Sequence, residues 1–279
     1  MAVQEQEQMV QTKGKEKMNP ENDTNRKYAV LSCSGGMDST SLLIRLLAEG
    51  YKVQIINFDY GSHQNMVEEQ RLDNVVQYLR EHDLPVFYEN FDLSDIMGRF
   101  YSSLTDSGLE TPNGNYADEN MKITVVPNRN AIFASLIYGI ALSVAKRNNV
   151  DVKIAMGVHN GDHTIYPDCT PEFFDQLYKA FAAGNWDAEK VQLYLPYLNG
   201  DKGDIVIDCH KNCEQLGLDF DYIMSNTLTC YKPTADGKSC GQCGSCTERI
   251  EAFTKAGVKD PVKYVEPEGE VHGTEGNPD

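Results

Sequence analysis

Short apolar runs and helical segments alternate along the central part of the 279-residue chain. The apolar runs contain many β-branched and aromatic residues, which is typical of strands, whereas the longer segments between them show helical periodicity. The predicted strands are 28–33, 52–61, 85–91 and 152–158, and the predicted helices are 39–50, 67–81 and 131–146. Strands that alternate with helices need crossover connections, which make neighbouring strands parallel. The sequence therefore predicts an α/β fold in which helices flank a parallel sheet.

Composition narrows the functional classes. With 41% hydrophobic residues the chain can bury one large core, to which a small module is appended. The net charge of -17 and the isoelectric point near 4.7 argue against a surface that binds nucleic acid through clustered Lys and Arg. The sequence shows no run of about 20 apolar residues, and residues 1–27 lack the apolar core of a secretory signal. We therefore expect a cytoplasmic protein without a membrane segment.

The stretch LSCSGGMDST, residues 31–40, joins the first predicted strand to the first predicted helix. A strand, a glycine-rich turn and a helix aim backbone N–H groups and the positive end of the helix dipole at an anion. The turn has neither the Gly-Lys ending of a P-loop nor the three spaced glycines of a dinucleotide-binding turn. The sequence therefore predicts a phosphate site of another kind. The alternative is an ordinary turn in which Asp38 or a serine caps the helix.

Four of the eight cysteines fall within residues 230–246, in the pattern C-x9-C-x2-C-x2-C. They are Cys230, Cys240, Cys243 and Cys246. Four thiolates in a short glycine-containing loop match a closed tetrahedral zinc site. Two disulfides would need an oxidising compartment, and an iron–sulfur cluster would also accept four thiolates. We predict a structural zinc ion, because four protein ligands leave no position for a catalytic water.

The turn that begins at Ser34 resembles the SGGxDS motif of the PP-loop ATP pyrophosphatases, which cleave ATP between its α- and β-phosphates. The resemblance implies an adenine nucleotide alpha hydrolase-like, Rossmann-like domain that uses ATP and magnesium. Gly35 and Gly36 would let the backbone approach the pyrophosphate, and Asp38 would help to position Mg²⁺. The implied nucleotide-binding residues are Cys33, Ser34, Gly35, Gly36, Met37, Asp38, Ser39, Thr40 and Ser41. Cys33 is also explained as a small buried residue at the strand end.

Further blocks of sequence resemble the 7-cyano-7-deazaguanine synthase family over about residues 28–255. They are VVPNRNAIFAS (125–135), GVHNGDHTIYPDCTPEF (157–173), KGDIV (202–206) and the terminal CGQCGSC with ERIEAF. That family converts 7-carboxy-7-deazaguanine to its nitrile with ammonia and ATP, through an adenylated carboxylate and an amide. The resemblance implies that this chain is an ATP-dependent carbon–nitrogen ligase of queuosine biosynthesis.

The same resemblance implies catalytic roles beyond the loop. The implied catalytic residues are Asp38, Arg129, Lys202 and Asp162. Arg129 would donate to phosphate oxygens and Lys202 would place a positive charge near the same group. The alternative for both is a surface ion pair. Asp162 and His163 would approach the activated carboxylate, and His163 is equally explained as a loop histidine.

The implied substrate-binding residues are Tyr166, Asp168 and Glu172. The carboxylates would accept hydrogen bonds from the ring N–H and the exocyclic amine of the purine-like substrate. Asp168 or Glu172 could equally cap the helix that begins near Thr170.

Three positions depart from the family's pattern. Residues 59–65 read DYGSHQN where the family commonly has DYGQRH, Asn128 replaces the Gly of VPGRN, and Thr170 replaces the Arg of DCRPEF. Because two cationic groups are missing, the end product stays open: the chain could stop at the amide or transfer the acyl group to another amine. A zinc-bearing tRNA-modifying PP-loop protein is a further alternative.

These observations predict four regions along the chain. They are a disordered tail (1–26), a PP-loop nucleotide-binding α/β domain (27–225), a four-cysteine zinc module with a C-terminal helix (226–258) and an acidic flexible tail (259–279). The expected partners are the small molecules 7-carboxy-7-deazaguanine, ammonia and ATP, without membrane or nucleic acid. A homodimer is left open.

Overall fold

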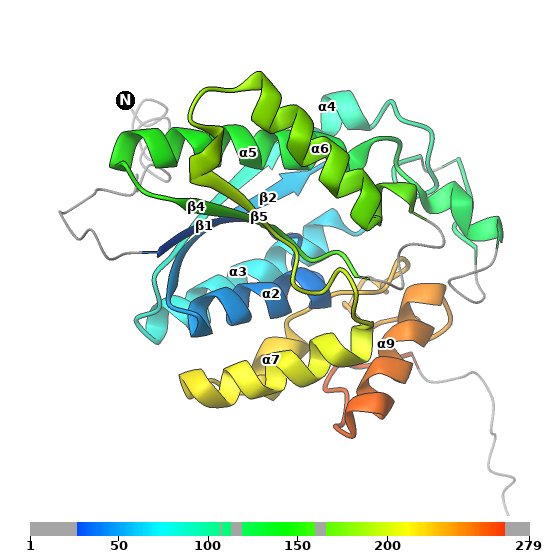
Figure 1. Cartoon of the computed structure of the whole chain (residues 1–279). Helices are drawn as coiled ribbons and strands as arrows, with labels where there is room; N and C mark the ends of the chain where they lie inside the picture. Colours follow the sequence, from blue (N-terminus) through cyan, green and yellow to red (C-terminus); the bar gives the residue numbers. More distant parts are fainter. Residues whose placement is uncertain (1–26, 107, 113–118, 160–165, 266–279) are drawn as a thin grey trace, which may run out of the picture.

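The computed structural model describes residues 27–106, 108–112, 119–159 and 166–265. Five parallel strands form one sheet in the order β3-β2-β1-β4-β5 (Figure 1). The strands are β1 (Lys27–Ser32), β2 (Tyr51–Asp59), β3 (Val86–Asp92), β4 (Val152–Met156) and β5 (Val191–Tyr194). The predicted α/β class is confirmed, and β5 adds a strand to the four that the sequence predicts. The predicted tail 1–26 and the segment 266–279 lie outside the described residues.

Helices connect the strands and cover both faces of the sheet. The α-helices are α2 (Met37–Ala48), α3 (Asn65–Glu81), α4 (Ser94–Met97), α5 (Arg129–Asn148), α6 (Pro171–Gly184), α7 (Lys202–Leu216), α8 (Phe220–Ser225) and α9 (Gly244–Ala256). Short 3-10 helices are η1 (Glu119–Thr124), η3 (Pro167–Cys169) and η4 (Ala188–Lys190). Each of the three predicted helices overlaps one of these, namely α2, α3 and α5.

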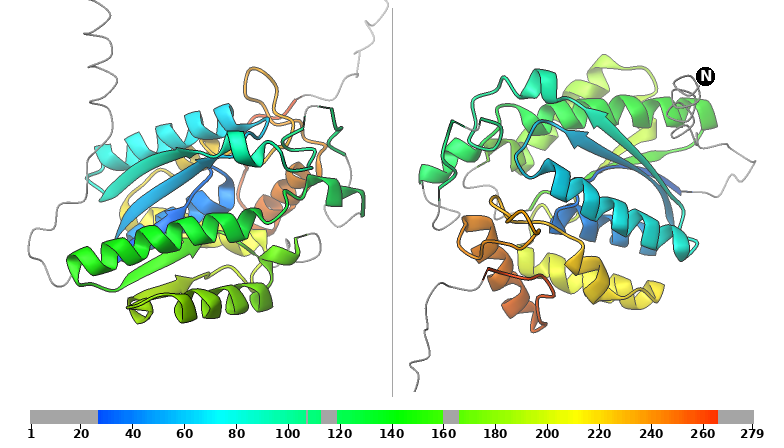
Figure 2. Two further views of the ribbon diagram at one scale, coloured as in Figure 1. Left: turned by 90° about the horizontal axis from the view of Figure 1, so that it is seen from above. Right: turned by 180° about the vertical axis from the view of Figure 1, so that it is seen from behind.

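The layers follow from the apolar pattern of the central strand. Ala29, Val30 and Leu31 of β1 are fully buried, because α2 and α3 cover one face of the sheet and α5 and α6 cover the other (Figures 1 and 2). A strand covered on both faces is apolar at successive positions rather than at alternate ones. Truncating such a side chain typically costs about 2 to 5 kcal/mol. The sheet is therefore a rigid platform for the loops at its carboxyl edge.

Helix α5 lies in the one segment of the described part, Met121–Asn148, that is long and apolar enough by composition to cross a membrane. Its side chains Phe133, Ile137 and Ala141, however, belong to the core cluster that also contains Val30 and Ile154 of the sheet. The helix is thus explained as a core helix, and the described residues give no indication of a membrane protein.

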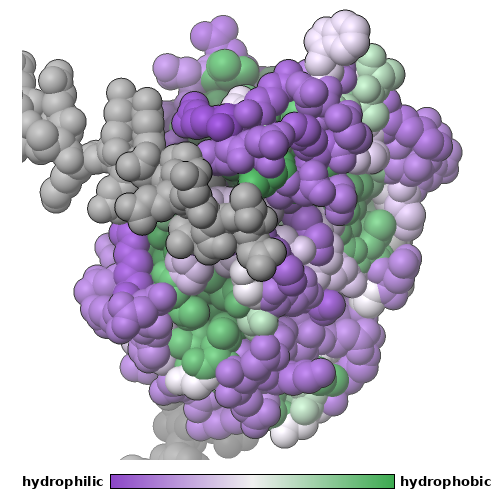
Figure 3. All heavy atoms as spheres, turned by 60° about the vertical axis from the view of Figure 1, so that its left-hand side comes forward, coloured by the Kyte–Doolittle hydropathy of each residue, from purple (hydrophilic) through white to green (hydrophobic). Residues whose placement is uncertain are grey.

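One face of the molecule shows how polar the exterior is. The face shown in Figure 3 is mainly hydrophilic, with smaller apolar areas between the polar side chains.

Helix α9 packs against α7 at the end of the molecule that carries the four cysteines (Figures 1 and 2). The division into domains stays a prediction.

Candidate active site and metal centre

The candidate site lies at the carboxyl ends of β1 and β4. In the sheet, β1 lies between β2 and β4. The chain runs from β1 to β2 and β3 on one side of β1, and it places β4 and β5 on the other side. Such a switch point leaves a crevice between the loops, where parallel α/β sheets commonly bind ligands. A cavity of about 210 Å³ lies there. Its lining includes Ser34, Gly36, Asp38, Ser39, Arg129 and Lys202.

The loop between β1 and α2 has the backbone shape that an anion site needs. Gly35 has φ of 85°, and a Cβ at this position would lie 2.5 Å from the carbonyl oxygen of Glu68. The Ser34 hydroxyl accepts from the Gly36 N–H at 3.2 Å, and the Ser39 hydroxyl donates to the Gly36 carbonyl at 3.3 Å. Gly36 is the N-cap of α2, and within the described residues no side chain caps this helix. The alternative of an ordinary turn capped by Asp38 or a serine is therefore not what the structure shows.

Three residues of the predicted nucleotide-binding set lie behind the loop. Cys33, Thr40 and Ser41 are buried, and the Ser41 hydroxyl donates to the Met37 carbonyl at 2.8 Å. Burial raises the pKa of the Cys33 thiol, which is what a core residue rather than a reactive thiolate would show. These side chains support the loop from the core side and do not line the cavity. Their contact with a nucleotide stays a prediction.

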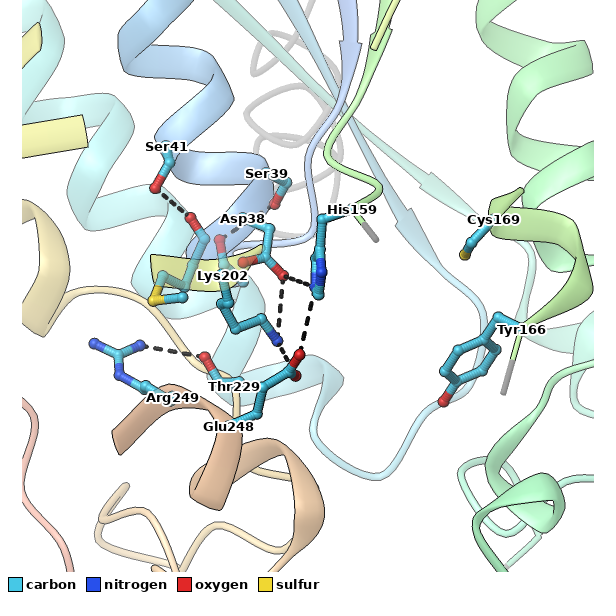
Figure 4. Close-up of polar contacts among 12 residues, drawn as sticks. Asp38, Ser39, Ser41, His159, Tyr166, Cys169, Lys202, Thr229, Glu248 and Arg249 are labelled. Carbon is cyan, nitrogen blue, oxygen red and sulfur yellow. Dashed lines mark hydrogen bonds and ion pairs between the residues drawn. The ribbon is translucent and has the colours of Figure 1, made fainter. Parts of the chain in front are cut away.

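Four charged or titratable side chains from four segments meet beside the loop (Figure 4). The Lys202 Nζ lies 2.7 Å from Glu248 Oε2 and 3.5 Å from Asp38 Oδ2. The His159 Nε2 lies 3.7 Å from Asp38 Oδ2 and 4.0 Å from Glu248 Oε1. Because the Lys202 side chain is only 6% exposed, a surface ion pair does not describe it. Near-burial strengthens these charge interactions relative to a surface pair.

Arg129, the first residue of α5, lines the same cavity. Its guanidinium lies 5.9 Å from the ring centre of Tyr60 and 5.7 Å from that of Tyr166. Burial lowers the pKa of Arg129, but electrostatic interaction with groups such as Tyr60 and Tyr166 outweighs burial and raises it, so the charge persists. The preceding Asn128 has φ of 59°, a left-handed conformation that Asn adopts more easily than most residues. Asn128 therefore has a backbone conformation that Gly would also adopt without strain.

Glu68 of α3 also lines the cavity. Burial raises the pKa of its carboxyl to about 8, although the positive charge of Arg129 acts in the opposite direction. Burial likewise raises the pKa of Tyr60, with the Glu68 carboxyl contributing. A carboxyl group that titrates near neutral pH inside a cavity is a candidate acid–base group.

The predicted substrate-binding residues differ in where they lie. Tyr166 is buried and its hydroxyl lies 2.9 Å from that of Thr124. Asp168 Oδ2 accepts from the Asn130 N–H at the start of α5 (3.2 Å), while Asp168 Oδ1 is buried without a hydrogen-bond partner among the described residues. Glu172 is exposed and does not line the cavity. Asp168 Oδ1 is therefore an unused acceptor next to Asn130 and Cys169, which line the cavity, whereas Tyr166, Asp168 and Glu172 are not themselves among the lining residues.

The N-cap of α6 is the hydroxyl of Thr170, which accepts from the Phe173 N–H at 3.3 Å. The alternative in which Asp168 or Glu172 caps this helix is therefore wrong. A threonine in place of the family's Arg is explained locally by this cap. Asp162 and His163 lie outside the described residues, so their predicted roles stay predictions.

The four cysteines of the predicted metal site converge. Their Sγ atoms all lie within 4.8 Å of one another, and the distance between Cys240 and Cys246 is 3.9 Å. Thiolates placed about 2.3 Å from one zinc ion in a tetrahedron would lie about 3.8 Å apart. The backbone N–H groups of Lys232 and Cys240 donate to the Cys230 Sγ at 3.3 and 3.2 Å, as expected around a negatively charged ligand. The donor set therefore fits a metal ion.

Sequence reasoning did not identify three residues of the site: Glu68, His159 and Glu248. His159 comes two residues after Gly157, at the carboxyl end of β4, and its position there was the available signal. Glu248 lies in ERIEAF, where it looks like a solvated residue on a helix face. Only the tertiary contact of α9 with α7 brings it to the loop.

The parallel sheet, the SGGMDS loop at its switch point and the four-cysteine cluster define the class: a PP-loop α/β protein with a C-terminal metal-binding module. The model of the family described as "Queuosine biosynthesis protein QueC" matches residues 28–257. The 7-cyano-7-deazaguanine synthase of Psychromonas ingrahamii is 40% identical over 241 residues, which cover 85% of this chain and 98% of the relative. That of Methanoregula boonei is 41% identical over 236 residues, again with 85% and 98% coverage. The chain belongs to the QueC family.

Among solved structures, a 4-thiouridine synthetase in complex with RNA and with bound ATP is 14% identical. It aligns over 83% of this chain and 50% of that one, with a TM-score of 0.42. A likeness this distant supports no argument about function.

Proposed function

We propose that this chain converts 7-carboxy-7-deazaguanine and ammonia to 7-cyano-7-deazaguanine with two successive activations by ATP, in the cytoplasm. Family membership supports the substrate class. The observation that carries the chemistry is one cavity, lined by the uncapped start of α2, by Lys202 and by Arg129. A helix start and two cations at one place favour a triphosphate.

The first activation makes the carboxylate reactive. A carboxylate oxygen attacks the α-phosphorus of ATP, the bond to the bridging oxygen of the β-phosphate breaks, and pyrophosphate leaves. The loop amides and Lys202 stabilise the charge on the departing pyrophosphate, and Arg129 donates to the remaining phosphate. The product is an acyl adenylate, whose leaving group is AMP.

Ammonia then attacks the acyl carbon, AMP leaves, and one proton is lost to give the amide. In the second activation the amide oxygen attacks the α-phosphorus of another ATP, the bond to the bridging oxygen breaks, and pyrophosphate leaves. The carbon–oxygen bond to AMP then breaks, and the nitrogen, which loses its two protons over these steps, forms the nitrile. Glu68, whose pKa is about 8, is mostly protonated at pH 7, and its ionised fraction, which grows as the pH rises toward 8, can accept one of these protons.

Asp38 would hold a Mg²⁺ ion that neutralises phosphate charge. The four cysteines would hold zinc in a structural role, since a single ion fits their mutual separations, whereas a multi-iron cluster spreads its thiolates over several metal atoms. Asp168 Oδ1 would accept from the N–H groups of the deazaguanine ring, because it is buried and lacks a partner in the described residues.

The test is incubation of the purified protein with ATP, Mg²⁺, ammonia and 7-carboxy-7-deazaguanine, followed by mass spectrometry of the products. We expect AMP, the amide as an intermediate and the nitrile at the end. An amide that accumulates without nitrile would show a ligase that stops at the amide. Absence of AMP would refute the proposal. Asp38→Asn should lower AMP formation at least about tenfold with folding retained.

Metal content is measured separately by elemental analysis. We expect one zinc per chain, and Cys243→Ser should lose metal and thermal stability together, because a structural ion contributes to folding. Iron with visible absorbance would refute the zinc assignment.

A further inference from the structure

The cysteine module contacts the nucleotide site at two points. The backbone N–H of Leu228, just before the first cysteine of the cluster, donates to the Gly35 carbonyl in the loop at 3.0 Å. Just after the last cysteine, Glu248 Oε2 accepts from Lys202 Nζ at 2.7 Å. Both contacts are made by residues within two positions of a metal-ligating cysteine. Very little chain therefore separates the metal cluster from the nucleotide site.

The cysteines also set the position of α9. Cys243 is the N-cap of this helix and Cys246 lies in its first turn. Near the other end of α9, Lys255 Nζ lies 2.6 Å from Asp201 Oδ2 and 2.9 Å from Asp204 Oδ1, which form the capping box of α7. Helix α9 is therefore held at its first turn by the metal cluster and near its last turn by the start of α7.

This placement determines where the Lys202 ammonium lies. Glu248 is its nearer carboxylate partner, at 2.7 Å, whereas Asp38 is 3.5 Å away (Figure 4). The Glu248 carboxylate therefore holds the ammonium at the shorter distance, while Asp38 stays within ion-pair distance of both Lys202 and His159. Without Glu248, the Lys202 ammonium would pair more closely with Asp38.

We propose that Glu248 is a positioning residue that acts through Lys202, and that metal binding by the four cysteines strengthens ATP binding through it. The proposal rests on the proposed function, because it requires ATP to bind at the loop. The metal itself takes no part in the chemistry. The metal holds the first turn of α9 in place, and this turn sets the position of the Glu248 carboxylate. The carboxylate in turn sets the position of the Lys202 ammonium.

The first test uses the reciprocity of linked binding equilibria. If bound metal raises ATP affinity, then bound ATP must raise metal affinity by the same factor. Metal affinity is measured by equilibrium competition with a chelator, with and without saturating ATP and Mg²⁺. We expect ATP to raise the metal affinity of the wild-type chain by roughly five- to tenfold. Glu248→Gln should lose this effect, and the control Glu251→Gln, exposed on the same helix, should retain it. Chelation of metal by ATP itself is the same for each variant and cancels.

The second test is a double-mutant cycle on ATP affinity, measured by calorimetry on metal-loaded protein with ATP and Mg²⁺. Glu248→Gln should weaken ATP binding roughly five- to tenfold, and Glu251→Gln should not. If Glu248 acts through Lys202, the double variant with Lys202→Gln binds ATP no more weakly than Lys202→Gln alone. Additive losses would show that Glu248 acts independently.

Each outcome decides the question. ATP affinity of Glu248→Gln equal to that of Glu251→Gln would overturn the proposal. So would a wild-type metal affinity that ATP does not change once the affinity is expressed per free metal ion, with chelation by ATP measured without protein and subtracted, a measurement that needs no variant to fold. If the wild-type chain gives no heat with ATP, the proposed function itself fails. If ATP binds but is not coupled to the metal, the proposed function stands and this inference falls.

Discussion

Replacing Glu68 with Gln should stabilise the protein at alkaline pH and have little effect at acidic pH. The pKa of this carboxyl is raised from 4.5 to about 8 by burial, so the folded state binds the proton more tightly than the unfolded state. Its favourable contribution is complete below about pH 4.5 and is lost as the pH rises through about 8. At about 1.4 kcal/mol per pH unit, the difference between 4.5 and about 8 corresponds to about 5 kcal/mol. This is an upper bound, because the cavity admits water, which screens the charge.

The groups that face Glu68 are Arg129 of α5, Tyr60 after β2 and Cys33 after β1. Urea unfolding of Glu68→Gln and wild type at about pH 5, 7 and 9 measures the effect. We expect the variant to gain at least about 1 kcal/mol at the highest pH and progressively less toward the lowest. Glu81→Gln, exposed at the other end of α3, should differ from wild type by less than about 0.5 kcal/mol throughout. A Glu68→Gln difference that is the same at all three pH values would refute the reasoning.

Three further changes test the loop, the module and the substrate side. Gly35→Ala should destabilise the fold by more than about 1 kcal/mol in urea unfolding, because φ is 85° and the added Cβ would meet the Glu68 backbone. The same change should abolish ATP binding in calorimetry. An ATP affinity equal to that of the wild type would contradict this. Arg249→Leu should cost about 3 to 5 kcal/mol in the same unfolding assay, since it leaves the Asp260 carboxylate, which lies 2.9 Å from the buried guanidinium, without its cation. Tyr264 and Val262 would remain its only hydrogen-bond donors among the described residues. Asp168→Ala should weaken deazaguanine binding by about 1 to 3 kcal/mol in calorimetry while ATP affinity stays the same; the reverse pattern would move Asp168 to the nucleotide.

The parts of this protein that follow from sequence are local. Strand β1 can be predicted because its three successive buried residues form an apolar run. The loop after it can be predicted because a strand, two glycines and a helix follow one another directly in the sequence. The cysteine cluster can be predicted because its ligands are close in the chain. Glu248 and His159 were not predicted, because their importance comes from contacts between segments that only the tertiary fold brings together. The acceptor role of Asp168 toward α5, rather than α6, likewise depends on a contact with Asn130.

The four segments that meet at Lys202 have a consequence for the order of folding during synthesis. The loop with Asp38 leaves the ribosome early and can pack with β1 and β2, but Glu248 is translated only after the whole sheet. Contacts so distant in sequence form late, because the intervening chain must first be closed into a loop. A nascent chain that ends before α9 lacks Glu248 and therefore the nearer carboxylate partner of Lys202. If Glu248 positions Lys202 as proposed, such a chain binds ATP more weakly than the finished protein, and full affinity is reached only when α9 has been translated and has packed against α7.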